Sequence, residues 1–315
     1  MSSFASARFA MPIIGLGESF VTVAITAPEV QQAVAALGLD AGPLDQYFAT
    51  RAAPMGAVPA EVVISTFAFF YPGLVREHIP EAWQKAAPEL ILDTQRTAVD
   101  RKLSSLLGAW TTSKEAGQAA ELVRASVEAC DVAGRPLAAG LASLDWPDSP
   151  HMVICHGFTF LREFRGDSHV AAVITNDLDG CEALYLWCAA ASGGCPCHTF
   201  IGGAAPGPVL LEVSRSSRGW PMEEWQAAAE RLATRGLVSA DGSITEAGMH
   251  LHRKIEQQTD DTVNRWQWRR QESEIELLAE LMAAPAALLR GGFELEIPQV
   301  DVESSWHQSP EEVAG

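Results

Sequence analysis

Several ionisable side chains lie close together between two apolar segments, residues 152–161 and 170–174. They are Arg162, Glu163, Arg165, Asp167 and His169. An isolated buried charge is energetically very unfavourable, so buried charges pair with one another or with a ligand. An arginine of this group is suited to bind an anionic group through two parallel hydrogen bonds. Glu163, Asp167 or His169 would then be placed to move a proton.

Helical spacing divides these side chains between neighbouring faces. Arg162, Glu163, Gly166, Asp167 and Val170 are related by three or four positions, while Arg165 and His169 lie on an adjacent face. The same charges also fit an intramolecular ion-pair network that joins the two halves of the chain. A metal site that combines Asp167 and His169 with Glu61 or His156 is disfavoured, since residues two apart on a helix face different sides. We therefore predict no metal site, and the sequence identifies no cofactor.

The first half of the chain adds three candidate residues. Arg51 and Glu61 are single charges in apolar surroundings, and a long-range salt bridge or a ligand would explain either of them. Tyr71 follows a phenylalanine-rich segment, where a core aromatic side chain is a simpler explanation than a phenol at a site. The candidate catalytic residues are thus Glu163, Asp167 and His169, and the candidate substrate-binding residues are Arg51, Glu61, Tyr71, Arg162 and Arg165.

Composition limits the classes of protein. The chain has 315 residues, of which 48% are hydrophobic and 20% charged, and its formal net charge is −18. Nucleic-acid-binding proteins normally carry a basic surface, so this charge makes nucleic acid an unlikely partner. No apolar run reaches the length of about 18 residues that predicts a membrane span, because Glu18 interrupts residues 9–27. We expect a cytoplasmic protein with no membrane partner.

Alanine-rich segments with helical periodicity predict a mainly α fold, and residues 89–107 show this periodicity clearly. Residues 58–71 are expected to form one buried helix that ends before Pro72. Glycines and prolines between residues 131 and 150 indicate a domain boundary, which gives domains 1–145 and 146–293. Residues 294–315 contain six acidic and no basic residues and are predicted to be a disordered acidic tail.

Residues 219–252 have the order helix, hairpin, helix. Trp220-Pro221 begins the first helix, and Gly236 is suited to end it. Residues 237–245, with an Asp-Gly turn, predict a hairpin, and Thr245 is placed to cap the next helix. The predicted fold is therefore mainly α, with a winged-helix module that carries a small β-hairpin wing and packs on a second helical domain.

This module resembles the recognition helix and wing of MarR-type regulators, at residues 231–238 followed by 244–248. Over roughly residues 18–292, the chain also resembles an actinobacterial family of MarR-like helix-turn-helix proteins of undefined role. The matching segments are residues 47–56, 161–170, 214–220 and 256–260. The resemblance implies the fold and a homodimer formed through terminal helices. The chain departs from the pattern at Phe164, where the family has histidine, and in the cysteine-bearing loop 192–208.

The wing of this chain lacks the basic residues that reach DNA in MarR-type regulators. Residues 239–243 read Ser-Ala-Asp-Gly-Ser, and residues 208–283 contain nine basic and thirteen acidic side chains. We therefore predict a small-molecule-binding protein on a winged-helix scaffold. One form of this prediction is a cofactor-independent acid–base enzyme of specialised metabolism that acts on a polar or anionic metabolite. Its pocket is expected between the two halves. One alternative is a ligand-responsive regulator whose basic face comprises Arg231, Arg235, Arg253 and Lys254, and another is a partner protein that uses the acidic tail.

Overall fold

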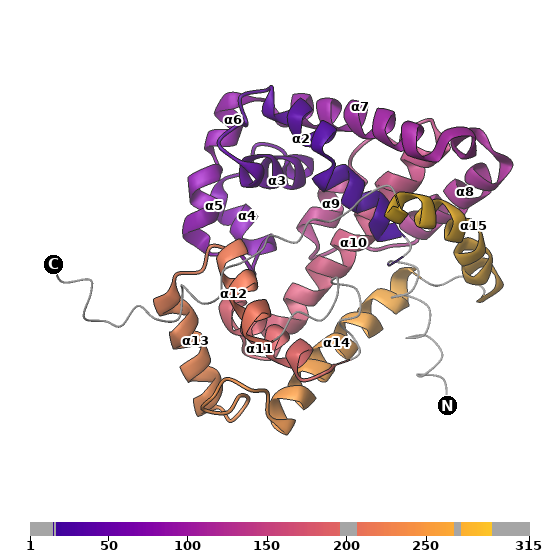
Figure 1. Cartoon of the computed structure of the whole chain (residues 1–315). Coiled ribbons are helices and arrows are strands. Elements are labelled where there is room, and N and C mark those ends of the chain that lie inside the picture. Colours follow the sequence, from indigo (N-terminus) through magenta and orange to yellow (C-terminus); the bar gives the residue numbers. More distant parts are fainter. Residues whose placement is uncertain (1–14, 16, 196–206, 268–271, 292–315) are drawn as a thin grey trace. The chain divides into compact units, whose positions relative to one another are not determined.

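The computed structural model describes residues 15, 17–195, 207–267 and 272–291. Figure 1 shows their arrangement, in which nearly all regular structure is helical. The labelled helices are α2 (Pro28–Ala35), α3 (Pro43–Ala52), α4 (Ala60–Thr66), α5 (Pro72–His78), α6 (Glu81–Lys85), α7 (Pro88–Leu107), α8 (Lys114–Glu128), α9 (Pro136–Ala142), α10 (Pro150–Thr175), α11 (Gly180–Ser192), α12 (Gly207–Ser217), α13 (Met222–Thr234), α14 (Glu246–Gln267) and α15 (Glu272–Gly291), with short 3-10 helices η1 (Ala53–Met55) and η2 (Gly108–Thr112). The predicted mainly α fold is confirmed.

Proline begins many of these helices. Its fixed φ suits the first helical position, where a backbone N–H would have no partner within the helix. The helix predicted from the periodicity of residues 89–107 is confirmed as α7, which begins at Pro88. Helix α8 has a side-chain cap instead, since the Ser113 hydroxyl accepts a hydrogen bond from the Ala116 N–H at 3.1 Å.

The prediction of a single helix over residues 58–71 is wrong. Helix α4 ends at Thr66, because the backbone leaves the helical conformation at Phe67, and α5 begins at Pro72. Phe67 and Phe70 are buried against Phe48, with ring centroids 5.8 and 5.0 Å away. This aromatic packing favours a bend between two short helices over one continuous helix.

The predicted β-hairpin wing is also wrong. The described residues contain no β-strand, and Val238 and Ile244 are joined by one isolated antiparallel bridge. The Asp241 carboxylate accepts hydrogen bonds from the Ser239 hydroxyl and the Ser243 N–H, which closes the segment into a tight turn. Thr245 accepts from the Gly248 N–H at 3.0 Å and caps α14, as predicted. The chain therefore returns to a helix before a strand can extend.

The described chain divides into two compact units. Unit 1 contains the described residues within 1–179 and 253–293, and unit 2 contains those within 180–252. Helices α9 and α10, which flank the boundary predicted at 145/146, both belong to unit 1. The acidic tail predicted at 294–315 lies outside the described residues. No described helix has the length and hydropathy needed to cross a membrane.

Helix α10 is the central element of unit 1 (Figure 1). It packs against α7, α8 and α9, and a main hydrophobic core includes Phe158, Phe160, Leu161 and Phe164 from α10. Gly157 permits close contact with α8, because a Cβ atom at this position would lie 2.2 Å from Val123 Cγ1. Charged side chains on such a buried helix must find partners on its neighbours.

The core of unit 2 contains aromatic and aliphatic side chains of α11 and α13. The rings of Tyr185 and Trp225 pack with centroids 5.1 Å apart, and Leu232 is fully buried. Gly248 lies so close to the backbone carbonyl of Leu237 that a side chain would collide with it. The turn 237–245 is thereby held against the start of α14.

Candidate functional site

Glu163 on α10 and Arg51 on α3 form a buried, bidentate ion pair. The distances from Arg51 Nη2 to Glu163 Oε2 and Oε1 are 2.7 and 2.9 Å, and Arg51 Nε lies 3.2 Å from Oε1. Arg162 Nη1 donates to the same carboxylate at 2.8 Å, and Arg162 Nε donates to Glu18 at 3.2 Å. The structure thus brings together three of the predicted site residues, Arg51, Arg162 and Glu163.

This network holds Glu163 in its ionised form. Burial raises the pKa of Glu163, but the charges of Arg51 and Arg162 outweigh burial and hold the pKa below its usual value. Arg51 also donates to the Tyr47 hydroxyl, and its guanidinium group lies 4.5 Å from the centre of the Phe67 ring. The hydrogen-bond donors of Arg51 are therefore largely occupied within the protein. The Glu163 carboxylate accepts from the guanidinium groups of both Arg51 and Arg162.

Asp167 lies on α10 at a different contact, with the start of α9. Its Oδ2 accepts a hydrogen bond from the Ala138 N–H at 3.0 Å. Burial and, to a smaller extent, the charge of Glu163 raise the pKa of Asp167, while the N–H groups of Ala138 and Leu137 oppose them. The resulting pKa is about 6. The neighbouring Ser168 accepts a hydrogen bond from Arg135 Nε at 3.0 Å. Asp167 therefore joins two helices of unit 1.

Arg165 and His169 face the part of α14 that belongs to unit 1. Arg165 Nη2 lies 2.6 Å from Glu256 Oε2 and 3.3 Å from Asp260 Oδ1. His169 Nδ1 lies 3.0 Å from the Thr259 hydroxyl. Burial raises the pKa of Asp260, although the charge of Arg165 opposes this effect. These two predicted residues thus form a polar contact between α10 and α14.

Glu61 and Tyr71 are not part of either group. Glu61 forms an ion pair with Arg76 at 3.3 Å, and the two side chains are 68% and 55% exposed. Tyr71 is half-buried and precedes the first residue of α5. The sequence around Glu61 is apolar, but α4 turns this side chain to solvent.

A cavity of about 100 Å³ lies in unit 1 beside the Arg51–Glu163 pair. Its walls come from stripes at helical spacing on α7 and α10, together with α3, α9 and residues near 24 and 147. The apolar lining residues are Ala24, Ile25, Pro54, Leu92, Val99, Leu141, Leu144, Pro147, Met152 and Cys155, and the polar ones are Thr50, Arg51, Gln95, Arg96, His156, Thr159 and Glu163. Of the predicted site residues, Arg51 and Glu163 line this cavity.

The prediction missed Arg96 and His156 as residues of this cavity. Burial, together with the smaller effect of the nearby Arg96 charge, lowers the pKa of His156 to about 4. The imidazole is therefore neutral at physiological pH. Its ring packs edge-on against Trp146, with centroids 4.9 Å apart. The signal for these cavity residues in the sequence was helical spacing. One helix face carries Leu92, Gln95, Arg96 and Val99, and a face of another helix carries Met152, Cys155, His156, Thr159 and Glu163.

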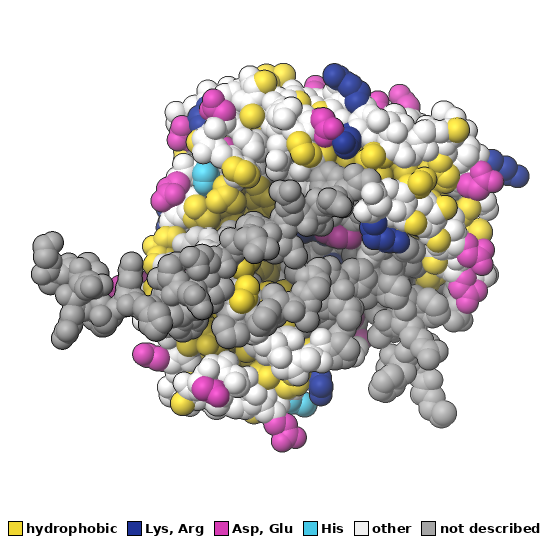
Figure 2. Space-filling view, viewed as in Figure 1, with side chains coloured by type: hydrophobic (Ala, Val, Ile, Leu, Met, Phe, Trp, Pro, Cys, Tyr) yellow, Lys and Arg dark blue, Asp and Glu magenta, His cyan; other side chains and the backbone are white. Residues whose placement is uncertain are grey.

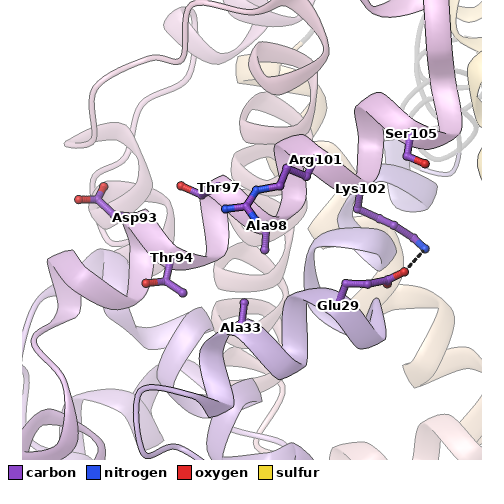
Figure 3. A pocket seen from close by; sticks show the side chains of 9 residues that line it. All are labelled: Glu29, Ala33, Asp93, Thr94, Thr97, Ala98, Arg101, Lys102 and Ser105. Atoms are coloured by element: carbon purple, nitrogen blue, oxygen red, sulfur yellow. Dashed lines mark hydrogen bonds and ion pairs between the residues drawn. The ribbon is translucent and has the colours of Figure 1, made fainter.

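A larger depression of about 620 Å³ lies between α2 and α7 (Figure 3). Lys102 Nζ on α7 lies 2.7 Å from Glu29 Oε1 on α2, and this ion pair is drawn in Figure 3. Two acidic and two basic side chains line it, with Ala33 and Ala98 as the apolar residues. A ligand site usually combines a largely apolar wall with a few polar groups. The cavity between α7 and α10 fits that description better.

Within the part of the chain that the structure describes, no group of three or more His, Cys, Asp or Glu side chains is arranged to hold a metal ion. The cysteine-bearing loop extends beyond Cys195 into residues outside the described ranges.

In unit 2, α12 and α13 are joined by residues 218–221, an order and a turn length typical of a helix-turn-helix pair. The first turn of α13 exposes Glu223 and Glu224. Arg231 and Arg235, expected to belong to a basic face, lie 2.7 and 3.8 Å from the buried Glu182 carboxylate. Among the described residues on the face in Figure 2, lysine and arginine are interspersed with acidic side chains and form no continuous basic surface.

The chain belongs to the helix-turn-helix family, because the model of that family matches residues 13–293. The match includes both units and supports the helix-turn-helix part of the predicted resemblance. Membership favours a regulator-like fold. No curated protein and no solved structure matches this chain.

Proposed function

We propose that this protein is a small-molecule-binding member of the helix-turn-helix family, and that its ligand occupies the cavity between α7 and α10 in unit 1. The observation that carries the proposal is the lining of this cavity. Aliphatic side chains form most of its walls, while Arg96, His156 and Thr159 supply polar groups at the same surface. Such a combination of apolar area and a few oriented polar groups is typical of small-molecule sites.

Binding explains this arrangement better than acid–base catalysis. Of the three candidate catalytic residues, Glu163 alone lines the cavity. Arg51 and Arg162 hold its carboxylate ionised and occupy its oxygen atoms. A general base needs access to a substrate proton. We therefore assign Glu163 to the wall of a binding site for a polar or anionic metabolite.

A cavity-filling substitution tests this proposal. Ala24→Leu adds bulk to the cavity wall, whereas Ala33→Leu adds the same bulk in the depression between α2 and α7. Native mass spectrometry of gently purified protein should show a bound small molecule in the wild type and in Ala33→Leu, and none in Ala24→Leu. Retention of the same mass by Ala24→Leu, or a bare mass for all three proteins, would contradict the proposed function. Circular dichroism should show that both variants are folded.

A second candidate is a ligand-responsive regulator of the MarR type that binds DNA as a homodimer. Family membership supports the helix-turn-helix fold of this candidate. Its basic face would depend on Arg253 and Lys254, which are exposed, more than on Arg231 and Arg235, which face Glu182. DNA fragments selected from a random pool should then bind with an affinity that falls steeply as salt increases. The double variant Arg253→Glu, Lys254→Glu should weaken this binding. Failure to select any DNA would count against the regulator.

A further inference from the structure

We propose that the cavity between α7 and α10 binds a short aliphatic carboxylate, with Arg96 as the partner of the carboxylate and His156 as a second hydrogen-bond donor. This inference rests on the proposed function and names its class of ligand.

Most of the charges beside the cavity are balanced by ion pairs within the protein. Arg51, Arg162, Glu163 and Glu18 compensate one another through ion pairs of 2.7 to 3.2 Å. Arg51 has Glu163 and Tyr47 as hydrogen-bond partners, so its guanidinium is poorly placed to receive a ligand as well. The positive charge available for a ligand must come from another side chain of the wall.

Arg96 supplies that charge. Its half-buried side chain lines the cavity, and within the described ranges it has no ion pair and no side-chain hydrogen bond. Asp100, four positions later on α7, lies 2.6 Å from His151 Nε2 instead. A guanidinium group presents a planar set of donors that matches a carboxylate. An anionic ligand would therefore complete the charge balance of this cavity.

His156 adds a donor without adding a second charge. The neutral ring has one N–H donor and one acceptor nitrogen, and neither nitrogen has a hydrogen-bond partner among the described residues. Trp146 packs edge-on against the ring and is itself covered by the Arg124 guanidinium, 5.0 Å from its centre. The imidazole is thus held in place at the cavity wall while its polar atoms remain available.

The remaining wall sets the size and character of the ligand. Leu92, Val99, Leu141 and Met152 offer aliphatic surface. An apolar cavity of about 150 Å³ holds the six carbon atoms of benzene, so a volume of about 100 Å³ suits a carbon chain of about four atoms. Butanoate has the required carboxylate and a short aliphatic chain, and butanamide is its uncharged counterpart of nearly the same shape.

Binding of this pair to the full chain, dialysed free of any molecule retained on purification, tests the inference. Titration calorimetry, supported by ligand-observed NMR for weak binding, should give butanoate an affinity about tenfold higher than butanamide. Arg96→Met should remove this preference and leave the affinity for butanamide unchanged. The matched control is Arg101→Met, which changes an arginine of the same helix that lines the other depression. His156→Phe keeps the ring packing on Trp146 and should weaken butanoate binding several-fold.

The outcomes separate this inference from the proposed function. Equal binding of butanoate and butanamide, abolished in both cases by Ala24→Leu, would overturn the carboxylate assignment and leave the binding cavity supported. A preference for butanoate that persists in Arg96→Met would also overturn it. Failure of both compounds to bind would overturn the ligand class, while the mass retained on purification would decide separately whether the protein binds a small molecule.

Discussion

The Asp167 carboxylate on α10 caps helix α9 by accepting a hydrogen bond from the Ala138 N–H at 3.0 Å. Helix α9 begins at Pro136, which has no N–H, and its own N-cap residue, Arg135, makes no side-chain capping bond. The first N–H groups of a helix lack partners within the helix and favour a nearby acceptor. A residue that the sequence suggested as a proton carrier thus fixes one helix to another.

This contact makes stability depend on pH. The folded-state pKa of Asp167 is raised to about 6 from 3.8, so the fold favours the protonated form. That contribution is present below the unfolded-state pKa and is lost as pH rises through the folded-state pKa. Between pH 3.5 and 7, the wild type should lose about 3 kcal/mol of unfolding free energy relative to Asp167→Asn. Urea denaturation of both proteins across this range measures the difference.

The variant Asp167→Ala provides the control for capping itself. It removes the acceptor at every pH and should cost about 1 to 2 kcal/mol relative to Asp167→Asn. Parallel stability curves for the wild type and Asp167→Asn would show that the carboxyl group does not titrate with a raised pKa.

Breaking the Arg51–Glu163 pair should be far more damaging than breaking an exposed pair. Glu163→Gln leaves Arg51 and Arg162 without their shared carboxylate in a buried place, which should cost about 3 to 5 kcal/mol. Glu61→Gln breaks the exposed pair with Arg76 and should cost less than about 1 kcal/mol. Urea denaturation at neutral pH compares them. Similar losses for the two variants would contradict the assigned burial of the network.

Much of the helical architecture could be predicted, because its determinants are local. The periodicity of α7 and the Thr245 cap of α14 depend on residues within a few positions. The prediction of a β-hairpin wing was wrong because the Asp-Gly segment forms a turn that is stabilised by the Asp241 side chain and has no flanking strands. The separation of Glu61 from Glu163 depends on which face of α4 meets solvent, and the surrounding apolar sequence concealed it.

The candidate site was harder to predict, because it depends on contacts between distant segments. Arg51 was expected to need either a long-range salt bridge or a ligand, and the sequence did not identify Glu163, 112 positions away, as its partner. Arg96 and His156 resemble ordinary polar residues of helices until α7 and α10 face a common cavity. Helical stripes on both segments were visible in the sequence, whereas their mutual orientation was not.

Cys155 offers a chemical measure of access to the cavity wall. Burial raises the pKa of its thiol to about 12, so very little reactive thiolate exists near neutral pH. Peptide mapping after treatment with N-ethylmaleimide should find Cys155 unmodified in the native protein and modified in concentrated urea. A Ser104→Cys variant, exposed on α7, should be labelled under both conditions and controls for reagent activity. Rapid native labelling of Cys155 would show that the wall opens readily.

The protonation of His156 gives a prediction of opposite sign to that of Asp167. Its folded-state pKa is lowered to about 4 from 6.5, so the fold favours the neutral ring. The resulting stabilisation is present above the unfolded-state pKa and is lost as pH falls through the folded-state pKa. The wild type should therefore lose up to about 3 kcal/mol relative to His156→Phe between pH 7 and 3.5.

NMR titration of the imidazole, with His156→Phe used to assign the resonance, measures this pKa directly. Because the ring should stay neutral above about pH 5, the affinity for butanoate should be nearly constant between pH 6 and 8. A titration midpoint near the ordinary histidine value would mean that the ring is charged within the range where the ligand binds. Its role would then be that of a second cation, and butanoate affinity would rise as pH falls from 8 to 6.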